Sequence, residues 1–146
     1  MPTGDEFFVD ANIIIYSATP GPHREACFEI LDAIAAGGAS GRTSPSALEE
    51  VWHIELSGRA GNLNGLTRHA FALFTPLLAV TDEAFRLAFG LQARSALGAN
   101  DRLHVGTCLA YGIRTIVSAD AAFDGIPTIS RVDPLDAAAR QQLLDN

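Results

Sequence analysis

Five acidic residues stand where they could together hold a metal ion. Asp10 follows the apolar run FFV, and Asp120 follows IVSA, so both come directly after stretches typical of buried strands. Glu50 and Asp101 lie inside helical patterns, and Asp124 follows four residues after Asp120. Carboxylate oxygens are the ligands that hard divalent cations prefer. The residues therefore predict an Mg²⁺ site, which Mn²⁺ could also occupy, built from Asp10, Glu50, Asp101 and Asp120 with Asp124 behind them.

A cation is the physical reason to bring such side chains together. Converging carboxylates repel one another, and burial raises their pKa further. A bound divalent ion relieves this repulsion, lowers the pKa of a water molecule and stabilises charge on a phosphodiester. The expected reaction is hydrolysis by metal-activated water. The chain has no Lys, and it offers no His pair or Ser or Cys nucleophile for a 2′-hydroxyl or covalent route.

Several of these acids also have a purely structural interpretation. Asp10 could cap the helix that follows it, and Asp101 could serve at a helix N-terminus. Asp124 could begin a turn. Glu49 and Glu50 compete for one place at the site. Glu49 has the spacing of a capping box from the serine three residues earlier, so Glu50 is the expected metal ligand.

The aromatic residues near these acids have less specific patterns. Trp52 is expected in the core, because helical spacing places it beside Leu48 and Val51. His53 and His104 have no partner at a spacing typical of zinc sites, so surface or core roles are expected for both.

Strand patterns alternate with helical patterns along the chain. This alternation predicts one α/β domain over residues 1–146, with a mainly parallel sheet of about five strands and helices on both faces. Ligands bind beyond the carboxyl ends of such strands, so Asp10 and Asp120 are expected to meet at one edge. The expected strands are 7–10, 41–43, 77–80, 114–117 and 127–129, and the expected helices are 22–36, 45–56, 65–75, 82–94, 100–112 and a terminal one from 134.

Composition sets limits on the class of protein. Apolar residues make up 48% of the chain, which predicts a packed core. The net charge of −7 argues against a generic basic nucleic-acid coat, and all ten basic residues are Arg. Cys27 and Cys108 lie far apart in apolar contexts and are expected to be reduced core residues. The sequence shows no signal region or apolar run that could span a membrane, so a cytoplasmic protein is expected.

Four segments carry a resemblance to a known family. They are FFVDANIIIY, SPSALEEVWH, GANDRLHVGTCLAYG and IVSADAAFDGIP followed by RVDP. In this order and spacing they resemble the PIN-domain nucleases, and in particular the VapC-type toxins of bacterial toxin–antitoxin pairs. The resemblance implies a PIN-like three-layer α/β/α fold and an Mg²⁺-dependent endoribonuclease. It implies Asp10, Glu50, Asp101 and Asp120 around the metal, with Asp124 as an auxiliary acid.

The same resemblance implies supporting residues and partners. Asn12 and Ser118 fall where the family keeps small polar residues beside the carboxylates. Arg102 stands where the family often has a small residue, which could alter contacts with a substrate or partner. A homodimer, an RNA substrate and a separate antitoxin protein are also implied.

Other function classes fit less well. Aspartate-phosphorylating α/β enzymes use a Lys against the phosphoryl group, and this chain has none. A P-loop motif is missing from the sequence. The alternative that stays open is a catalytically silent PIN fold that serves as a protein-interaction module.

Overall fold

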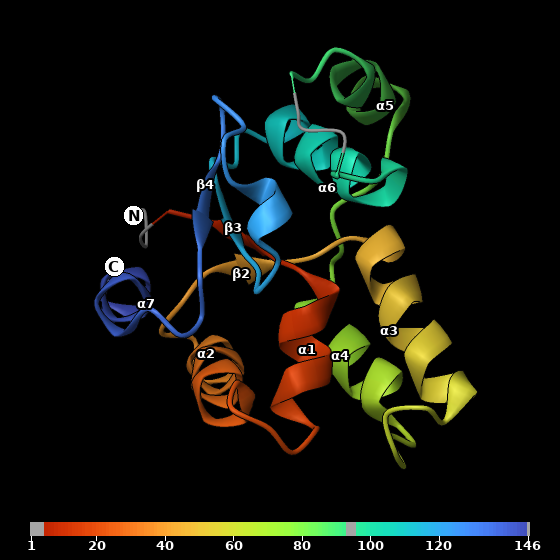
Figure 1. Cartoon of the computed structure of the whole chain (residues 1–146), viewed down its shortest axis with the longest axis vertical. Helices are drawn as coiled ribbons and strands as arrows, with labels where there is room; N and C mark the ends of the chain where they lie inside the picture. The colour runs from red at the N-terminus through yellow and green to blue at the C-terminus, as the bar shows by residue number, and fades with distance from the viewer. Residues whose placement is uncertain (1–4, 93–95, 146) are drawn as a thin grey trace.

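The computed structural model of the protein describes residues 5–92 and 96–145, in which strands alternate with helices (Figure 1). No helix in these residues is long and apolar enough to cross a membrane. In chain order the elements are β1 (Phe7–Val9), α1 (Ala11–Ser17), α2 (Arg24–Ala35), β2 (Gly41–Arg42), α3 (Pro45–Ser57), α4 (Leu66–Phe74), α5 (Asp82–Phe89), α6 (Ala99–Ala110), β3 (Thr115–Val117), the 3₁₀ turn η1 (Ala121–Phe123), β4 (Ser130–Val132) and α7 (Ala137–Leu144).

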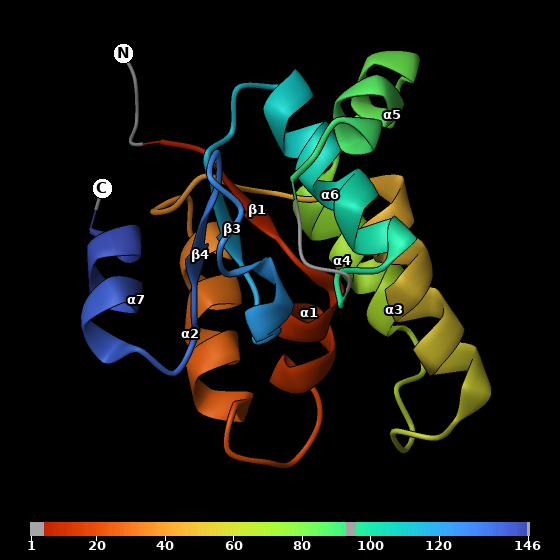
Figure 2. The same ribbon diagram turned by 45° about the horizontal axis from the view of Figure 1, so that its top comes forward.

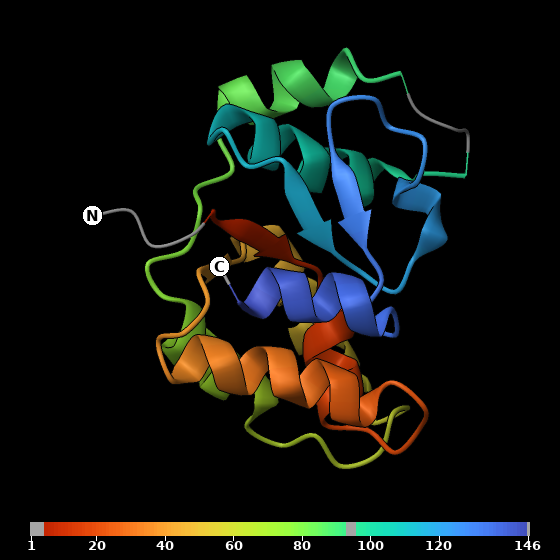
Figure 3. The same cartoon turned by 90° about the vertical axis from the view of Figure 1, so that its left-hand side faces the viewer.

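The strands form one parallel sheet in the order β2-β1-β3-β4. Helices α5 and α6 cover one face, and α1, α2 and α7 lie on the other, as Figure 3 shows with α5 and α6 at the top. This arrangement confirms the predicted α/β/α fold with a parallel sheet. The described residues contain four strands, where about five were expected.

Two of the expected strands differ from the structure. Residues 77–80 form no strand, although Leu78 is buried and its backbone N–H donates to the Thr43 carbonyl over 2.9 Å. Leu78 is thus buried without strand pairing, and periodicity cannot distinguish this case from a strand over so few residues. The last strand is Ser130–Val132, directly after the expected 127–129.

The helices differ from expectation mainly at their ends. Helix α1 was not in the set of expected helices, although the capping interpretation of Asp10 allowed a helix there. Its sequence IIIY has the β-branched character of a strand, and tertiary packing overrides that propensity. Helix α5 ends at Phe89 rather than near Arg94, which lies outside the described residues. Helix α3 begins with Pro45 at its first position, and the Ser44 side chain accepts from the Ala47 N–H.

The core is divided in two by the sheet. Phe7 and Val9 point to the face covered by α1 and α2, and Phe8 points to the opposite face, as strand alternation requires. Cys27 packs in the first cluster and Cys108 in the second, and both are free and buried, as expected.

Helices α5 and α6 approach so closely that only a glycine fits between them (Figure 2). A Cβ atom on Gly106 would overlap the Ala84 carbonyl oxygen and lie 3.0 Å from the Ala88 Cβ. A backbone oxygen cannot turn away as a flexible side chain could. The two helices would therefore have to separate to accommodate any larger residue.

We expect Gly106→Ala to lower the free energy of unfolding by about 2 kcal/mol, because overpacking outweighs the gain in helix propensity. Gly90→Ala is the matched control, since its new Cβ would have no neighbour nearer than 3.7 Å. Chemical unfolding of both variants measures the difference. Equal stability of Gly106→Ala and the parent protein would mean that the helices can separate without cost.

Candidate functional site

The site lies where two neighbouring strands of the sheet end. Strands β1 and β3 run parallel, with Val9 opposite Val117, so their carboxyl ends share one edge. The chain leaves β1 toward β2 on one side, whereas β3 leads to β4 on the other, and such a switch in strand order is where α/β sheets bind ligands. Asp10 follows β1 directly, and Ser118 and Asp120 follow β3.

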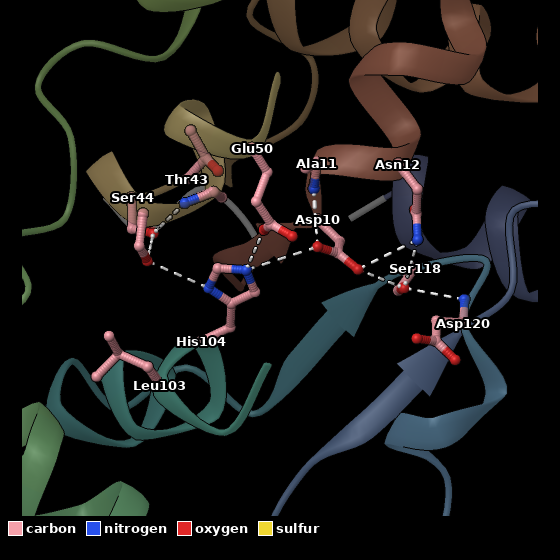
Figure 4. Close-up of polar contacts among 12 residues, drawn as sticks. Asp10, Ala11, Asn12, Thr43, Ser44, Glu50, Leu103, His104, Ser118 and Asp120 are labelled. Carbon is pink, nitrogen blue, oxygen red and sulfur yellow. Dashed lines mark hydrogen bonds and ion pairs between the residues drawn. The ribbon is translucent and has the colours of Figure 1, made fainter. Parts of the chain in front are cut away.

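Asp10 is buried and held by three hydrogen bonds. Its Oδ1 accepts from the Ala11 N–H over 2.8 Å. Its Oδ2 accepts from the Ser118 hydroxyl over 2.7 Å and from the Asn12 amide over 3.2 Å (Figure 4). Asp10 therefore caps α1 and also presents its carboxylate at the sheet edge, so the two interpretations of this residue are compatible.

Asn12 and Ser118 connect the end of β1 to the end of β3. The Asn12 amide nitrogen donates to the Ser118 hydroxyl over 3.1 Å, and its oxygen accepts from the Ala119 N–H over 3.2 Å. The Ser118 hydroxyl also accepts from the Asp120 N–H over 3.0 Å. Both residues thus contact Asp10 or its neighbours directly, at the positions where the family resemblance implied supporting roles.

Four side chains, one of them that of Asp10, converge at this edge of the sheet from three parts of the chain. Potential ligand atoms of Asp10, Glu50, Asp101 and His104 all lie within 4.8 Å of one another. Glu50 comes from α3, and Asp101 and His104 lie three residues apart on α6, so they share one helix face. Three carboxylates and an imidazole form a donor set that suits a divalent cation.

His104 is the member of this group that sequence reasoning missed. It is fully buried, and its Nε2 lies 2.8 Å from Glu50 Oε2 and 3.8 Å from Asp10 Oδ1. Its Nδ1 lies 3.4 Å from the Ser46 hydroxyl. The signal that could have identified His104 was its spacing of three residues from Asp101 on one helix. Its partners on α3 and after β1 are distant in sequence, so the sequence did not indicate those contacts.

The carboxyl groups carry the electrostatic cost of this arrangement. Burial raises the pKa of Asp10, and the charge of Glu50 adds to this effect, whereas His104 and the Ser118 hydrogen bond oppose it. Burial and the charge of Asp10 raise the pKa of Asp101 to about 6. A divalent cation would favour the ionised form of both groups, so the donor set and its electrostatics fit such an ion.

The remaining predicted acids lie outside the group of four. Asp120 is exposed, and its Oδ1 accepts from the Ala122 N–H over 2.9 Å. It nevertheless lines the same cavity, and its charge contributes to the raised pKa of Asp101. Asp124 pairs with Arg131 through two contacts of 2.8 and 3.2 Å. Glu49 is exposed on the cavity wall, so among the two glutamates it is Glu50 that meets His104.

A cavity of about 870 Å³ opens over these carboxylates between α1 and α3. Among the described residues that line it there is no Arg or Lys. Trp52 also lines it and is 55% exposed, so the expectation that Trp52 belongs to the core was wrong. The buried stripe of α3 consists of Ala47, Leu48 and Val51, and Trp52 lies about 100° further around the helix than Val51.

Comparison with known proteins agrees with this architecture. The PIN domain family matches residues 7–128, which is most of the chain. The chain belongs to the PIN domain family. This membership confirms the resemblance inferred from the sequence. Among curated proteins, none matches the sequence of this PIN domain.

Three solved structures share this fold over most of the chain. VapBC2 from Rickettsia felis, bound to a DNA fragment from the promoter, has a TM-score of 0.65 and 17% identity, over 87% of this chain and 97% of that one. A toxin–antitoxin complex from Klebsiella pneumoniae has a TM-score of 0.63 and 18% identity, over 90% and 98%. FitAcB from Neisseria gonorrhoeae has a TM-score of 0.63 and 16% identity, over 89% and 99%. At these identities the likeness concerns the PIN fold.

The raised pKa of Asp101 predicts how the metal-free PIN domain responds to pH. Between the ordinary value of 3.8 and about 6, the folded state binds a proton that the unfolded state has lost. The contribution of Asp101 to stability therefore falls as the pH rises through this window.

We expect Asp101→Asn to be more stable than the parent protein at neutral pH in EDTA, with a smaller difference near pH 4. Urea unfolding of both proteins at several pH values measures this difference. Added Mg²⁺ should stabilise the parent more than the variant. A stability difference that grows as the pH falls would contradict the assignment of the raised pKa.

Proposed function

We propose that this PIN domain is a metal-dependent endoribonuclease that hydrolyses RNA phosphodiester bonds. We further propose that it is a VapC-type toxin of a type II toxin–antitoxin pair. The observation that supports the nuclease best is the convergence of Asp10, Glu50, Asp101 and His104 within 4.8 Å at the switch in strand order. A packed fold has no reason to assemble three carboxylates there unless a cation joins them.

Mg²⁺ is the proposed cofactor, and Mn²⁺ could substitute for it. Asp10, Glu50 and Asp101 would hold the ion, and Asp120 faces the same cavity from the end of β3. When bound, the ion supplies charge stabilisation to the phosphodiester and lowers the pKa of a water molecule. Asp124 remains a proposed auxiliary acid, although its carboxylate pairs with Arg131.

The protein residues around the ion have distinct proposed tasks. Asn12 and Ser118 orient the Asp10 carboxylate, and His104 orients that of Glu50. The contacts of His104 also bear on the reaction route. Its Nε2 meets Glu50 and its Nδ1 lies near Ser46, so neither ring nitrogen is available to deprotonate an RNA 2′-hydroxyl. Attack by water, which leaves a 5′-phosphate and a 3′-hydroxyl, fits this geometry better.

The proposed partners follow from the structures that share the fold. Two of them are described as a VapBC assembly and a toxin–antitoxin complex. We therefore propose that a cognate antitoxin protein binds this chain. The resemblance to the PIN-domain nucleases supports the further proposals that the chain forms a homodimer and that it acts on RNA in the cytoplasm. A small neighbouring gene that encodes a DNA-binding protein with an extended tail would support the toxin assignment.

The alternative function is a catalytically silent PIN fold that serves as a protein-interaction module. Metal-dependent cleavage distinguishes the two. We expect the purified protein to cut structured cellular RNAs in Mg²⁺ or Mn²⁺ and to stop in EDTA. Asp10→Asn should abolish cleavage while the fold stays at least as stable, because a buried charge is removed. Mapping of the fragment ends should give 5′-phosphates.

Two outcomes of that experiment would contradict the proposal. Cleavage that persists in EDTA, or fragments that end in a 2′,3′-cyclic phosphate, would exclude metal-dependent hydrolysis. Intact RNA under every metal condition tested would favour the silent module.

Glu49 and Glu50 provide a matched pair of variants on one helix. Glu50→Gln should reduce turnover by orders of magnitude, because Glu50 belongs to the group of four. Glu49→Gln should change stability by no more than about 0.5 kcal/mol and leave most of the activity, since its side chain is exposed. Initial rates of RNA cleavage at saturating Mg²⁺ measure both effects. If the Glu49 variant were the inactive one, the metal site would have to be reassigned.

A further inference from the structure

We infer that Trp52 is a stacking platform for an unpaired base of the RNA substrate. This inference rests on the proposed nuclease function and deepens it. Its basis is an exposed aromatic wall in the same cavity that holds the carboxylates.

Trp52 lies two residues after Glu50 on α3, and about half of its side chain is open to solvent. Glu49, His53 and Leu56 line the cavity from the same helix, at spacings of three to four residues that define one face. Leu56 is 74% exposed, so this face of α3 has no packing partner within the described chain. Trp52 lies outside the buried stripe of α3, which contacts the core through Leu48 and Val51.

The opposite wall of the cavity also carries an aromatic ring. Helix α1 contributes Asn12, Ile15 and Tyr16 to the lining. Tyr16 is 36% exposed, and its ring packs against that of His23 with centroids 4.9 Å apart. Flat apolar surfaces therefore flank the carboxylates on both helices.

The charge of the cavity determines which part of a nucleic acid these walls can bind. Asp10, Glu49, Glu50, Asp101 and Asp120 line it, and its described lining contains no Arg or Lys that could pair with phosphates. A phosphate can be held at the carboxylates, where a cation neutralises them, but not along the walls. Bases are uncharged, and their faces stack on aromatic side chains in single-stranded complexes.

Stacking on Trp52 requires a base whose face is open. In a duplex the base faces are covered by their neighbours, and the protein meets phosphates and 2′-hydroxyls instead. Trp52 lines the same cavity as Glu50 but lies about 3 Å further along the helix axis and about 160° around it, so the base that stacks on Trp52 belongs to a nucleotide away from the cleaved bond.

Trp52 is the only tryptophan of the chain, so its fluorescence reports this position alone. The test uses Asp10→Asn, which should not cleave RNA, in Mg²⁺. This protein is titrated with single-stranded oligouridylate and, separately, with the duplex that oligouridylate forms with oligoadenylate. We expect the single strand to quench the emission in a saturable way and the duplex to quench it far less.

Variants on the same background separate stacking from other binding, with anisotropy of a labelled oligouridylate as the measurement. Trp52→Leu should weaken binding about tenfold, and Trp52→Phe, which keeps a ring, only about threefold or less. Phe89→Leu, at an 82% exposed position of α5 outside this cavity, is the control and should not change binding. Circular dichroism of each variant checks that the fold is retained.

Three results would overturn the inference. They are equal quenching by the duplex, unchanged affinity of Trp52→Leu for the single strand, and a blue shift of the emission that depends on protein concentration, which would place Trp52 against a second copy of the chain. The inference can fail while the proposed function stands, if the wild-type protein cleaves RNA and Trp52→Leu cleaves it with the same KM. The proposed function can fail while the inference stands, if oligouridylate binds through Trp52 but no RNA is cut.

Discussion

The structure around the site depends on one buried carboxylate. Asp10 ends β1, caps α1 through the Ala11 N–H, and accepts from Ser118 beyond β3. A charge in such a place is tolerated only when its oxygens have hydrogen-bond donors or a cation. Two of its donors, Ala11 and Asn12, lie on α1 and the third, Ser118, follows β3, so satisfying Asp10 fixes the direction of α1 and the approach of the two strand ends.

The same constraint explains why the site is poised for a cation. Asp10 and Asp101 both have raised pKa values in the metal-free protein, mainly because burial disfavours their ionised forms. His104 relieves part of this through its contacts with Glu50 and Asp10, but the described lining of the cavity adds no Arg or Lys. The buried carboxylates therefore reduce the stability of the metal-free protein at this site, while the rest of the fold is well packed. Such a local conflict is typical of functional sites rather than of structural ones.

The sheet topology explains how residues so far apart in sequence reach one cavity. Glu50 and Asp101 arrive on α3 and α6, and both helices begin on the side of the sheet where β1 and β3 end. Parallel strands require this, because each crossover helix returns the chain to the other edge. The arrangement of helices α1 and α3 therefore places the carboxylates at one end of the cavity and the aromatic residues along its walls.

Much of the fold could be predicted because it depends on local patterns. Alternating strand and helix signals indicated the parallel α/β fold, and Asp10 and Asp120 at strand ends indicated the edge with the site. Two elements differ from expectation where local patterns are ambiguous. Helix α1, with its run IIIY, was not among the expected helices, and the expected strand 77–80 does not form, because Leu78 is buried there without strand pairing. Short apolar segments look alike in both cases, and only their tertiary neighbours decide between them.

The sequence by itself determined the fold class, the PIN resemblance and the acids that could bind a metal, because these follow from spacing along the chain. Tertiary structure alone decided that His104 meets Glu50 and Asp10, that Asp124 pairs with Arg131, and that Trp52 faces the cavity. The reason is physical. Burial and partner choice depend on which helix faces meet in space, and a helix pattern with apolar residues on more than one side does not specify which of them the core will cover.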